Sequence, residues 1–267
     1  MSRFELYVAG DSWLHRSDAR VKLLFVAGAL SMALIYQSLW FTLASLLVLA
    51  GLHWSARVPS SRITSAIVAL APVSLLMFAL RTIFYPAGAT LFRLGPVVVT
   101  SAGAAQGAVV GLRLIVMALI VLLWLYTTRD RELVRSFLAL GLPYSWGLAF
   151  SLALRFLPTF ATTFTSISRT QQARALDLGS GGRIERLKKR IPIFVPMLIS
   201  VFRDSEQMAI ALEARGFGAQ AKRTDLHPLE FKRTDVVLAL SILLILLLLS
   251  WLRIGVGFGA EPLELLV

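Results

Sequence analysis

The chain contains no cysteine, which excludes disulfide bonds, thiolate catalysis and every metal or iron–sulfur site with cysteine ligands. Its three histidines, His15, His53 and His227, lack the paired spacing of a helical metal site. Acidic residues are also scarce, because no Asp or Glu occurs between Asp18 and Asp130. Paired carboxylates are therefore missing from a long N-terminal stretch, and a membrane-embedded enzyme would be hard to assemble there.

Charged residues make up only 16% of the 267 residues, whereas 57% are hydrophobic. That balance is too apolar for an ordinary soluble domain and predicts an all-α, polytopic membrane protein. The formal net charge of +12 does not by itself indicate a polyanion partner, because cytoplasmic loops of membrane proteins collect Lys and Arg. A nucleic-acid binder would interleave basic residues with exposed aromatic residues, and only one basic cluster is present. No nucleic-acid partner is predicted.

Apolar runs predict about five transmembrane helices in the lipid bilayer. The residues before the first run carry charges of both signs and do not resemble a cleavable signal peptide. The run over residues 21–54 is interrupted by Tyr36-Gln37-Ser38, which predicts a helical hairpin. Further spans are expected at about residues 63–85, 107–128 and 236–254. Arg81 and Arg113 lie within spans and need a polar partner or an interfacial position.

Lys and Arg are distributed unevenly among the loops, and this bias sets the orientation of a membrane protein. With the N-terminus in the cytoplasm, all the strongly basic loops are cytoplasmic and the external loops carry almost no charge. We therefore expect a multi-pass protein of the cytoplasmic (inner) membrane with an external C-terminus. Its predicted divisions are a four-span membrane domain (1–128), a cytoplasmic coupling domain of amphipathic helices (129–233), and a final span with an external tail (234–267).

The segment between the fourth and fifth spans is too polar at its edges to cross lipid and too apolar in its middle to be a solvated linker. Pro158 is expected to kink or end a helix in the apolar run over 144–160, and a polar helix is expected over 162–178. Pro192 and Pro196 are expected to open a further helix that Gly216 ends. The three prolines would thus shape the helices of this segment.

Alternative interpretations exist for three parts of this segment. Residues 144–160 could form a sixth span, which Arg155 near its centre and the external basic residues that would follow both disfavour. The glycine cluster at 179–182 is expected to be a turn, since no phosphate-loop Lys-Ser/Thr pair follows it. The basic residues over 183–190 are either a solvated flank or a site for anionic lipid head groups.

Two short motifs end the predicted helices of this segment: Ala173-Arg174-Ala175 and Ala214-Arg215-Gly216. The helix dipole favours an arginine in a last turn, so one such arginine has a plain structural explanation. Two of them, about forty residues apart, are suited to bidentate contact with a carboxylate or carbonyl groove on a partner. Their small neighbours would let each helix end enter a narrow cleft.

Several segments together resemble one family over nearly the whole chain. They are Leu14 through Leu24, Leu142-Pro143, Leu154 through Pro158, Gln172-Ala173-Arg174, Ile191-Pro192 and Ala211 through Phe217. Their order resembles the transmembrane T component of energy-coupling factor (ECF) transporters, the EcfT/CbiQ family. The resemblance implies a scaffold and coupling subunit with no catalysis or cofactor of its own. Two cytoplasmic ATP-binding-cassette ATPases would bind ATP, and a membrane S component would capture a vitamin or a transition metal.

By the same resemblance, Arg174 contacts one ATPase and Arg215 the other. The first motif departs from the family pattern at Ala175, where glycine is usual. Because a positive φ costs an alanine on the order of 1 kcal/mol, we expect the helix to continue past Arg174 to a turn at Gly179. The alternative functions are a solute-binding permease of another transporter class and a membrane-embedded enzyme.

Overall fold

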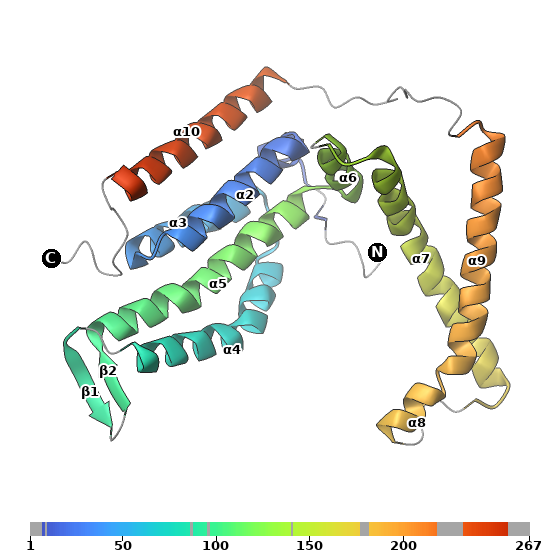
Figure 1. Ribbon diagram of the computed structural model, residues 1–267, viewed down its shortest axis with the longest axis horizontal. Helices are drawn as coiled ribbons and strands as arrows, with labels where there is room; N and C mark the ends of the chain where they lie inside the picture. Colours follow the sequence, from blue (N-terminus) through green and yellow to red (C-terminus); the bar gives the residue numbers. More distant parts are fainter. Residues whose placement is uncertain are drawn as a thin grey trace. The chain divides into compact units, whose positions relative to one another are not determined.

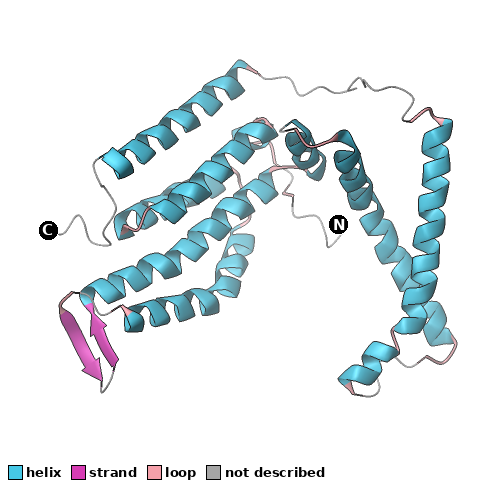
Figure 2. Cartoon of the chain, in the orientation of Figure 1, coloured by secondary structure: helices cyan, strands magenta, loops and turns pink. Residues whose placement is uncertain are grey.

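The computed structural model describes residues 7–8, 10–85, 88–94, 97–139, 141–176, 182–217 and 232–255. Helices dominate these residues, and the strands are confined to one hairpin (Figure 2). The elements are α1 (Trp13–Arg16), α2 (Ala19–Ile35), α3 (Leu39–Ser55), α4 (Ser60–Phe84), β1 (Thr90–Leu94), β2 (Val97–Thr100), α5 (Ser101–Thr127), α6 (Asp130–Ala139), α7 (Tyr144–Ala173), α8 (Arg183–Lys188), α9 (Ile191–Ala214) and α10 (Arg233–Gly255).

Contacts divide the chain into two compact units. The first unit comprises Arg3–Gly141 together with Leu229–Val267, and the second comprises Leu142–Pro228. Helix α6 packs against α2 and so belongs to the first unit, whereas the sequence analysis assigned it to the coupling domain. The second unit is built from α7, α8 and α9.

Helix α5 is the centre of the first unit, where it packs against α2, α3 and α4 (Figure 1). Its face toward these helices is buried and apolar over more than three turns, and it includes Val116, Leu119, Ile120 and Leu123. Helix α10 packs against α2. The outer faces of the same helices carry exposed leucine, valine and tryptophan side chains, as expected of a bundle that is solvated by lipid.

Glycines let α5 approach the backbone of α4 closely. Gly103, Gly107 and Gly111 recur at intervals of four and so share one helix face. A Cβ atom on Gly107 would lie 2.7 Å from the carbonyl oxygen of Phe78, and one on Gly111 would lie 2.9 Å from that of Ser74. At this separation, Ser74 Oγ donates a 2.7 Å hydrogen bond to the Gly111 carbonyl. Such close contact stabilises helix pairs in lipid, where burial of apolar surface contributes little.

The predicted fold class is confirmed. Among the described residues, four helices, α4, α5, α7 and α10, are long and apolar enough to cross a membrane, and α3 is a shorter apolar helix. The predicted interruption of the first apolar run is confirmed as well, because α2 ends at Ile35 and α3 begins at Leu39. Helices α4, α5 and α10 cover the other predicted spans.

Both arginines within the predicted spans have polar or aromatic partners. Arg113 Nη2 donates a 2.6 Å hydrogen bond to the carbonyl of Tyr36, the residue that caps α2. Tyr36 is 1% exposed, and its hydroxyl donates a 2.6 Å hydrogen bond to the Leu249 carbonyl on α10. Arg81 lies over the ring of Tyr85, with its guanidinium carbon 5.2 Å from the ring centroid. The turn between α2 and α3 is thereby tied to α5 and α10.

The β1–β2 hairpin was not predicted from the sequence, which indicated only an external loop after Tyr85. The strands are antiparallel, with Phe92 opposite Val99. The β-branched run Val97–Thr100 is typical of a strand, but at four residues it is too short to stand out beside the long apolar helices.

Pro158 does not end a helix, so the two helices predicted over 144–178 are one. Helix α7 runs without a break from Tyr144 to Ala173 and contains Pro158 in its interior. A proline has a helix-compatible φ and removes one main-chain hydrogen bond, so apolar helix formers on both sides can sustain the helix. Pro192 lies in the first turn of α9, as predicted for the helix start, whereas Pro196 lies in its interior because the helix already begins at Ile191.

The start of α2, the end of α5 and the start of α10 meet at one end of the first unit. Lys22 Nζ donates a 2.9 Å hydrogen bond to the carbonyl of Thr127, the last residue of α5. The main-chain N–H of Asp18 donates to Asp235 Oδ1 at 3.2 Å, next to the start of α10. The chain therefore leaves and re-enters the bundle at the same end.

Candidate functional site

The two Ala-Arg motifs occupy equivalent positions at the ends of the long helices of the second unit. Arg174 is the C-cap residue of α7, with φ −86° and ψ 23°. Arg215 is the C-cap residue of α9, with φ −89° and ψ 11°. Both residues have nearly the same backbone conformation, so each arginine side chain leaves its helix end in the same direction relative to the helix.

Helix α7 ends in a Schellman motif. The N–H of Leu176 donates to the Gln171 carbonyl at 3.1 Å, and the N–H of Ala175 donates to the Gln172 carbonyl at 3.0 Å. Ala175 has the left-handed conformation that this motif requires, with φ 64°. The two bonds satisfy carbonyls that would otherwise lack partners at the helix end.

Helix α9 ends in the same way. The N–H of Phe217 donates to the Leu212 carbonyl at 2.9 Å, and that of Gly216 donates to the Glu213 carbonyl at 2.8 Å. Gly216 has φ 71°, which glycine adopts without steric cost. The predicted glycine stop is confirmed at this end.

The prediction that α7 continues past Arg174 was wrong. The helix ends at Ala173, and Ala175 takes the positive φ that the sequence analysis judged too costly. That cost is on the order of 1–2 kcal/mol for a residue with a Cβ atom. Two main-chain hydrogen bonds, each contributing about 1 kcal/mol, offset it. The expected turn at 179–181 lies outside the described residues.

Both arginine side chains are exposed. The small neighbours Ala173, Ala175, Ala214 and Gly216 are exposed as well, so no described residue of the second unit covers either helix end. Among the residues that the structure describes, neither guanidinium has a hydrogen-bond or ion-pair partner. Each helix end therefore presents one guanidinium group, whose five N–H donors have no partner among the described residues.

The structure does not bring the two motifs together. Helices α7 and α9 pack against each other and run in opposite directions (Figure 1). The ring of Tyr144, at the start of α7, lies 6.2 Å from that of Phe217, just past the end of α9. Arg174 and Arg215 are therefore at opposite ends of the pair, separated by roughly the 35 Å length of a 24-residue helix. They form two separate contact points.

Most of the described apolar side chains of α7 and α9 are exposed or only partly buried. Only Gly147 on α7 and Ile193 on α9 are buried among the described residues of these two helices. Large apolar side chains on both helices are exposed, including Trp146 (67%) and Phe202 (71%). So many exposed large apolar side chains are typical of a surface that contacts a protein partner or lipid.

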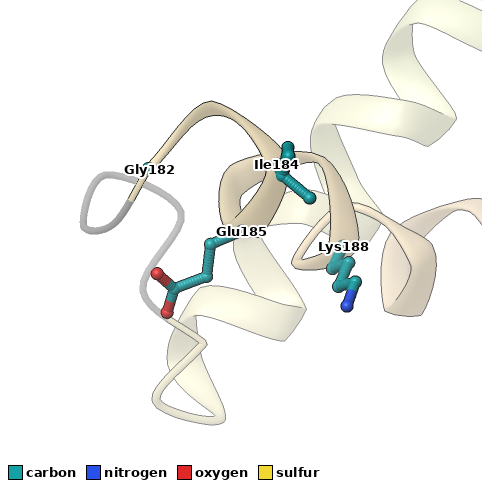
Figure 3. A pocket seen from close by; sticks show the side chains of 4 residues that line it. All are labelled: Gly182, Ile184, Glu185 and Lys188. Carbon is teal, nitrogen blue, oxygen red and sulfur yellow. The ribbon is translucent and has the colours of Figure 1, made fainter.

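Helix α8 and its surroundings form a shallow hollow of about 450 Å³. Gly182, Ile184, Glu185 and Lys188 line it, and Figure 3 shows the Glu185 and Lys188 side chains pointing apart. Lys189 pairs with Glu185 at 3.7 Å. The lining carries one carboxylate and only one cation, Lys188, so the hollow is unsuited to a phosphate group.

The N-terminal motif Leu14–Leu24 joins helix ends, a role that the sequence analysis did not identify. Asp18 caps α2 by accepting a 2.8 Å hydrogen bond from the N–H of Arg20. His15 contacts Ser12 Oγ at 2.7 Å and the Val8 carbonyl at 2.9 Å. Burial lowers the pKa of His15, against the raising effect of the Val8 carbonyl. In the sequence, the alternating charges of Leu14–Leu24 were the available signal for this role. The partners of these residues, however, lie far along the chain.

Comparison with known proteins identifies the family. The profile of a family described as cobalt transport protein (CbiQ) matches residues 10–226. The energy-coupling factor transporter transmembrane protein EcfT of Listeria innocua is 31% identical over 256 residues, which cover 92% of this chain and 96% of that protein. The proteins of the same name from Acidaminococcus fermentans and Bacillus subtilis are each 30% identical, cover 94% and 92% of this chain, and are themselves covered to 96%.

The matched region extends from the N-terminal motif through both helix-end motifs and, in these relatives, over nearly the full length. The apolar helices of the first unit agree with a multi-pass transmembrane subunit. The chain therefore belongs to the family of transmembrane T components of energy-coupling factor transporters.

Proposed function

We propose that this chain couples two cytoplasmic ATP-binding-cassette ATPases to a substrate-binding S component in the cytoplasmic membrane. One observation carries the proposal: two helix ends with the same backbone conformation, each with an exposed C-cap arginine, lie at opposite ends of an antiparallel helix pair. A pair of similar ATPases would offer two similar grooves at a distance from each other. Arg174 would enter one groove and Arg215 the other.

Each guanidinium would form a bidentate contact with carboxylate or carbonyl groups in its groove. The exposed alanine and glycine neighbours leave room for the walls of a narrow groove. When ATP binding and hydrolysis close and open the ATPase pair, the two contact points would move relative to each other. Helices α7 and α9 would carry this motion to the S component, which would turn to release its substrate inward.

ATP would be bound by the partner subunits, and this chain would need no cofactor and would catalyse no reaction itself. The S component would recognise the substrate, a vitamin or a transition metal. Pro158, Pro192 and Pro196 would set the shape of α7 and α9 by removing main-chain hydrogen bonds. No nucleic acid takes part.

The proposed orientation has a cytoplasmic N-terminus and an external C-terminus. It is supported by the Lys and Arg bias and by the common end at which α2 and α10 begin. A reporter enzyme that is active only outside the membrane, fused after Val267, should be active. A fusion that is active only in the cytoplasm would contradict this orientation.

Charge reversal at both helix ends tests the coupling role. The double variant Arg174→Glu/Arg215→Glu should abolish ATP-driven uptake into vesicles, while substrate capture by the S component persists. The matched control is Arg155→Glu/Arg203→Glu, which reverses two exposed arginines on the same two helices away from their ends. Wild-type uptake by the first variant, or equal loss in both, would refute the proposed contacts. Uptake without any ATPase or S component would instead indicate a self-contained permease.

A further inference from the structure

A hollow of about 650 Å³ lies in the first unit, between α1 and the start of α10. Its charged and aromatic lining residues are Trp13, Arg16, Lys232, Arg233 and Asp235, and Val237 and Leu238 supply its apolar side. It contains no residue of either helix-end motif. Neither the family comparison nor the proposed coupling role accounts for it.

Three cations from segments more than two hundred residues apart line this hollow. Arg16 ends α1, and Lys232 and Arg233 lie at the start of α10. Among the described residues, none of these three side chains has a hydrogen-bond or ion-pair partner. The packing of α10 against α2 holds the two segments together.

One carboxylate also lines the hollow, but it is engaged with the backbone. Asp235 is 3% exposed and accepts hydrogen bonds from the N–H groups of Asp18 and Lys232, both at 3.2 Å. These bonds join the start of α10 to the start of α2. Asp235 therefore fixes the geometry of the site, and the excess of positive charge remains for a ligand.

The remaining side of the hollow is apolar and belongs to a membrane-spanning helix. Val237 is 65% exposed on α10, and Leu238 follows it. Trp13 is 53% exposed, and its indole N–H donates a 2.7 Å hydrogen bond to Ser55 Oγ, which holds the ring in place. An amphipathic tryptophan between cations and an apolar helix face is typical of the boundary between head groups and acyl chains.

We propose that this hollow binds an anionic phospholipid, with Arg16, Lys232 and Arg233 around the phosphate and an acyl chain along Val237 and Leu238. The charges select an anionic head group, and the apolar side favours a lipid over free phosphate. In the orientation proposed above, the lipid belongs to the cytoplasmic leaflet. The lipid would hold α1 against the start of α10, next to the junction of α2, α5 and α10.

Native mass spectrometry of the full-length protein, released from detergent micelles, tests the site. The protein is titrated with phosphatidylglycerol, and separately with phosphatidylcholine that has the same acyl chains. We expect the wild type to retain a phosphatidylglycerol molecule that the triple variant Arg16→Gln/Lys232→Gln/Arg233→Gln binds at least tenfold more weakly, since each cation contributes about fivefold. Phosphatidylcholine should not bind at this site.

The matched control is Arg155→Gln/Arg169→Gln/Arg203→Gln, which removes the same charge from exposed positions on α7 and α9. It should retain the lipid with wild-type affinity. Equal loss in both triple variants would show a general charge effect and overturn the proposal, as would equal retention of the two lipids by the wild type. Displacement of phosphatidylglycerol by millimolar inorganic phosphate would assign the site to phosphate and overturn the lipid assignment.

A folding defect is distinguished by the conservative variant Arg16→Lys/Arg233→Lys, which keeps the charge and should retain phosphatidylglycerol. Loss of binding in this variant, with an unchanged elution volume, would show that charge does not hold the lipid. The measurement needs neither ATPase nor substrate, so its failure leaves the coupling role untouched.

Discussion

Ala175 and Gly216 adopt the same left-handed backbone conformation, with φ of 64° and 71°, and each follows the C-cap arginine of α7 or α9. A glycine is suited to this position, whereas an alanine is strained in it. The same two capping hydrogen bonds form at both ends. The arginine before each of these residues therefore has the same presentation, although the two motifs differ in sequence.

Replacing Ala175 by glycine should relieve this strain. We expect Ala175→Gly to stabilise the end of α7 by up to about 1 kcal/mol, because the relief of steric strain exceeds the entropy that glycine adds to the unfolded chain. Ala175→Val should destabilise it, since a β-branched residue tolerates positive φ poorly. Hydrogen exchange of the peptide that contains Leu176 measures both effects. Identical exchange in the two variants would contradict a left-handed residue at this position.

Exchanging arginine for lysine should weaken ATPase binding even though the charge is kept. Lys lacks the planar fork that forms two parallel hydrogen bonds, so Arg174→Lys and Arg215→Lys should each lose about 1.5–3 kcal/mol of binding free energy. Affinity of the purified ATPases for the membrane-reconstituted chain measures this loss. Arg203→Lys on the exposed face of α9 is the control and should bind normally. Full affinity in both helix-end variants would mean that charge alone suffices.

Adding a methyl group to the α4–α5 contact should destabilise the first unit. The Cβ atom of Gly107→Ala would overlap the Phe78 carbonyl, and overpacking of this kind costs about 1–3 kcal/mol. Gly51→Ala is the matched control, because no atom lies within 4 Å of its added Cβ and alanine favours a helix. The temperature at which the detergent-solubilised protein loses its monodisperse elution peak should fall for the first variant only. If both variants lost the peak at the same temperature, α4 and α5 would be farther apart than the structure shows.

Acidification should weaken the N-terminal contacts of His15. Burial lowers the pKa of His15 below its ordinary value of 6.5, so the folded protein favours the neutral ring. The stability that this preference contributes is complete above pH 6.5 and is lost as the pH falls through the lower folded-state pKa. His15→Gln should therefore flatten the pH dependence of thermal stability between about pH 7.5 and 5. An unchanged slope would assign the dependence to other groups.

The positions of the membrane helices followed from the sequence, because an apolar run of sufficient length has few alternatives in a bilayer. The break at Tyr36 and the glycine stop at Gly216 followed for similar local reasons. Arg174 and Arg215 were found by their repeated neighbours at two predicted helix ends. Their roles at the ATPases remain predictions, because the relatives establish the family and do not show these contacts.

Other features depended on contacts between distant segments. The partner of Arg113 is the Tyr36 carbonyl, and that of Lys22 is the Thr127 carbonyl, neither of which a local pattern can identify. The hollow with Arg16 at one edge and Lys232 at the other exists only because α10 packs against α2. The continuity of α7 through Pro158 also differed from the local expectation, because one lost hydrogen bond is small beside those of a long helix.

The sequence by itself determined that this is a membrane protein with two arginine-tipped helices, since hydrophobic length and helix-stop residues act locally. Only the tertiary structure decided that the two tips lie at opposite ends of an antiparallel pair, and that Ala175 turns as Gly216 does. The physical reason is that the direction of a helix and the strain tolerated at its end depend on packing and hydrogen bonds that complete the fold, and residue preferences do not contain that information.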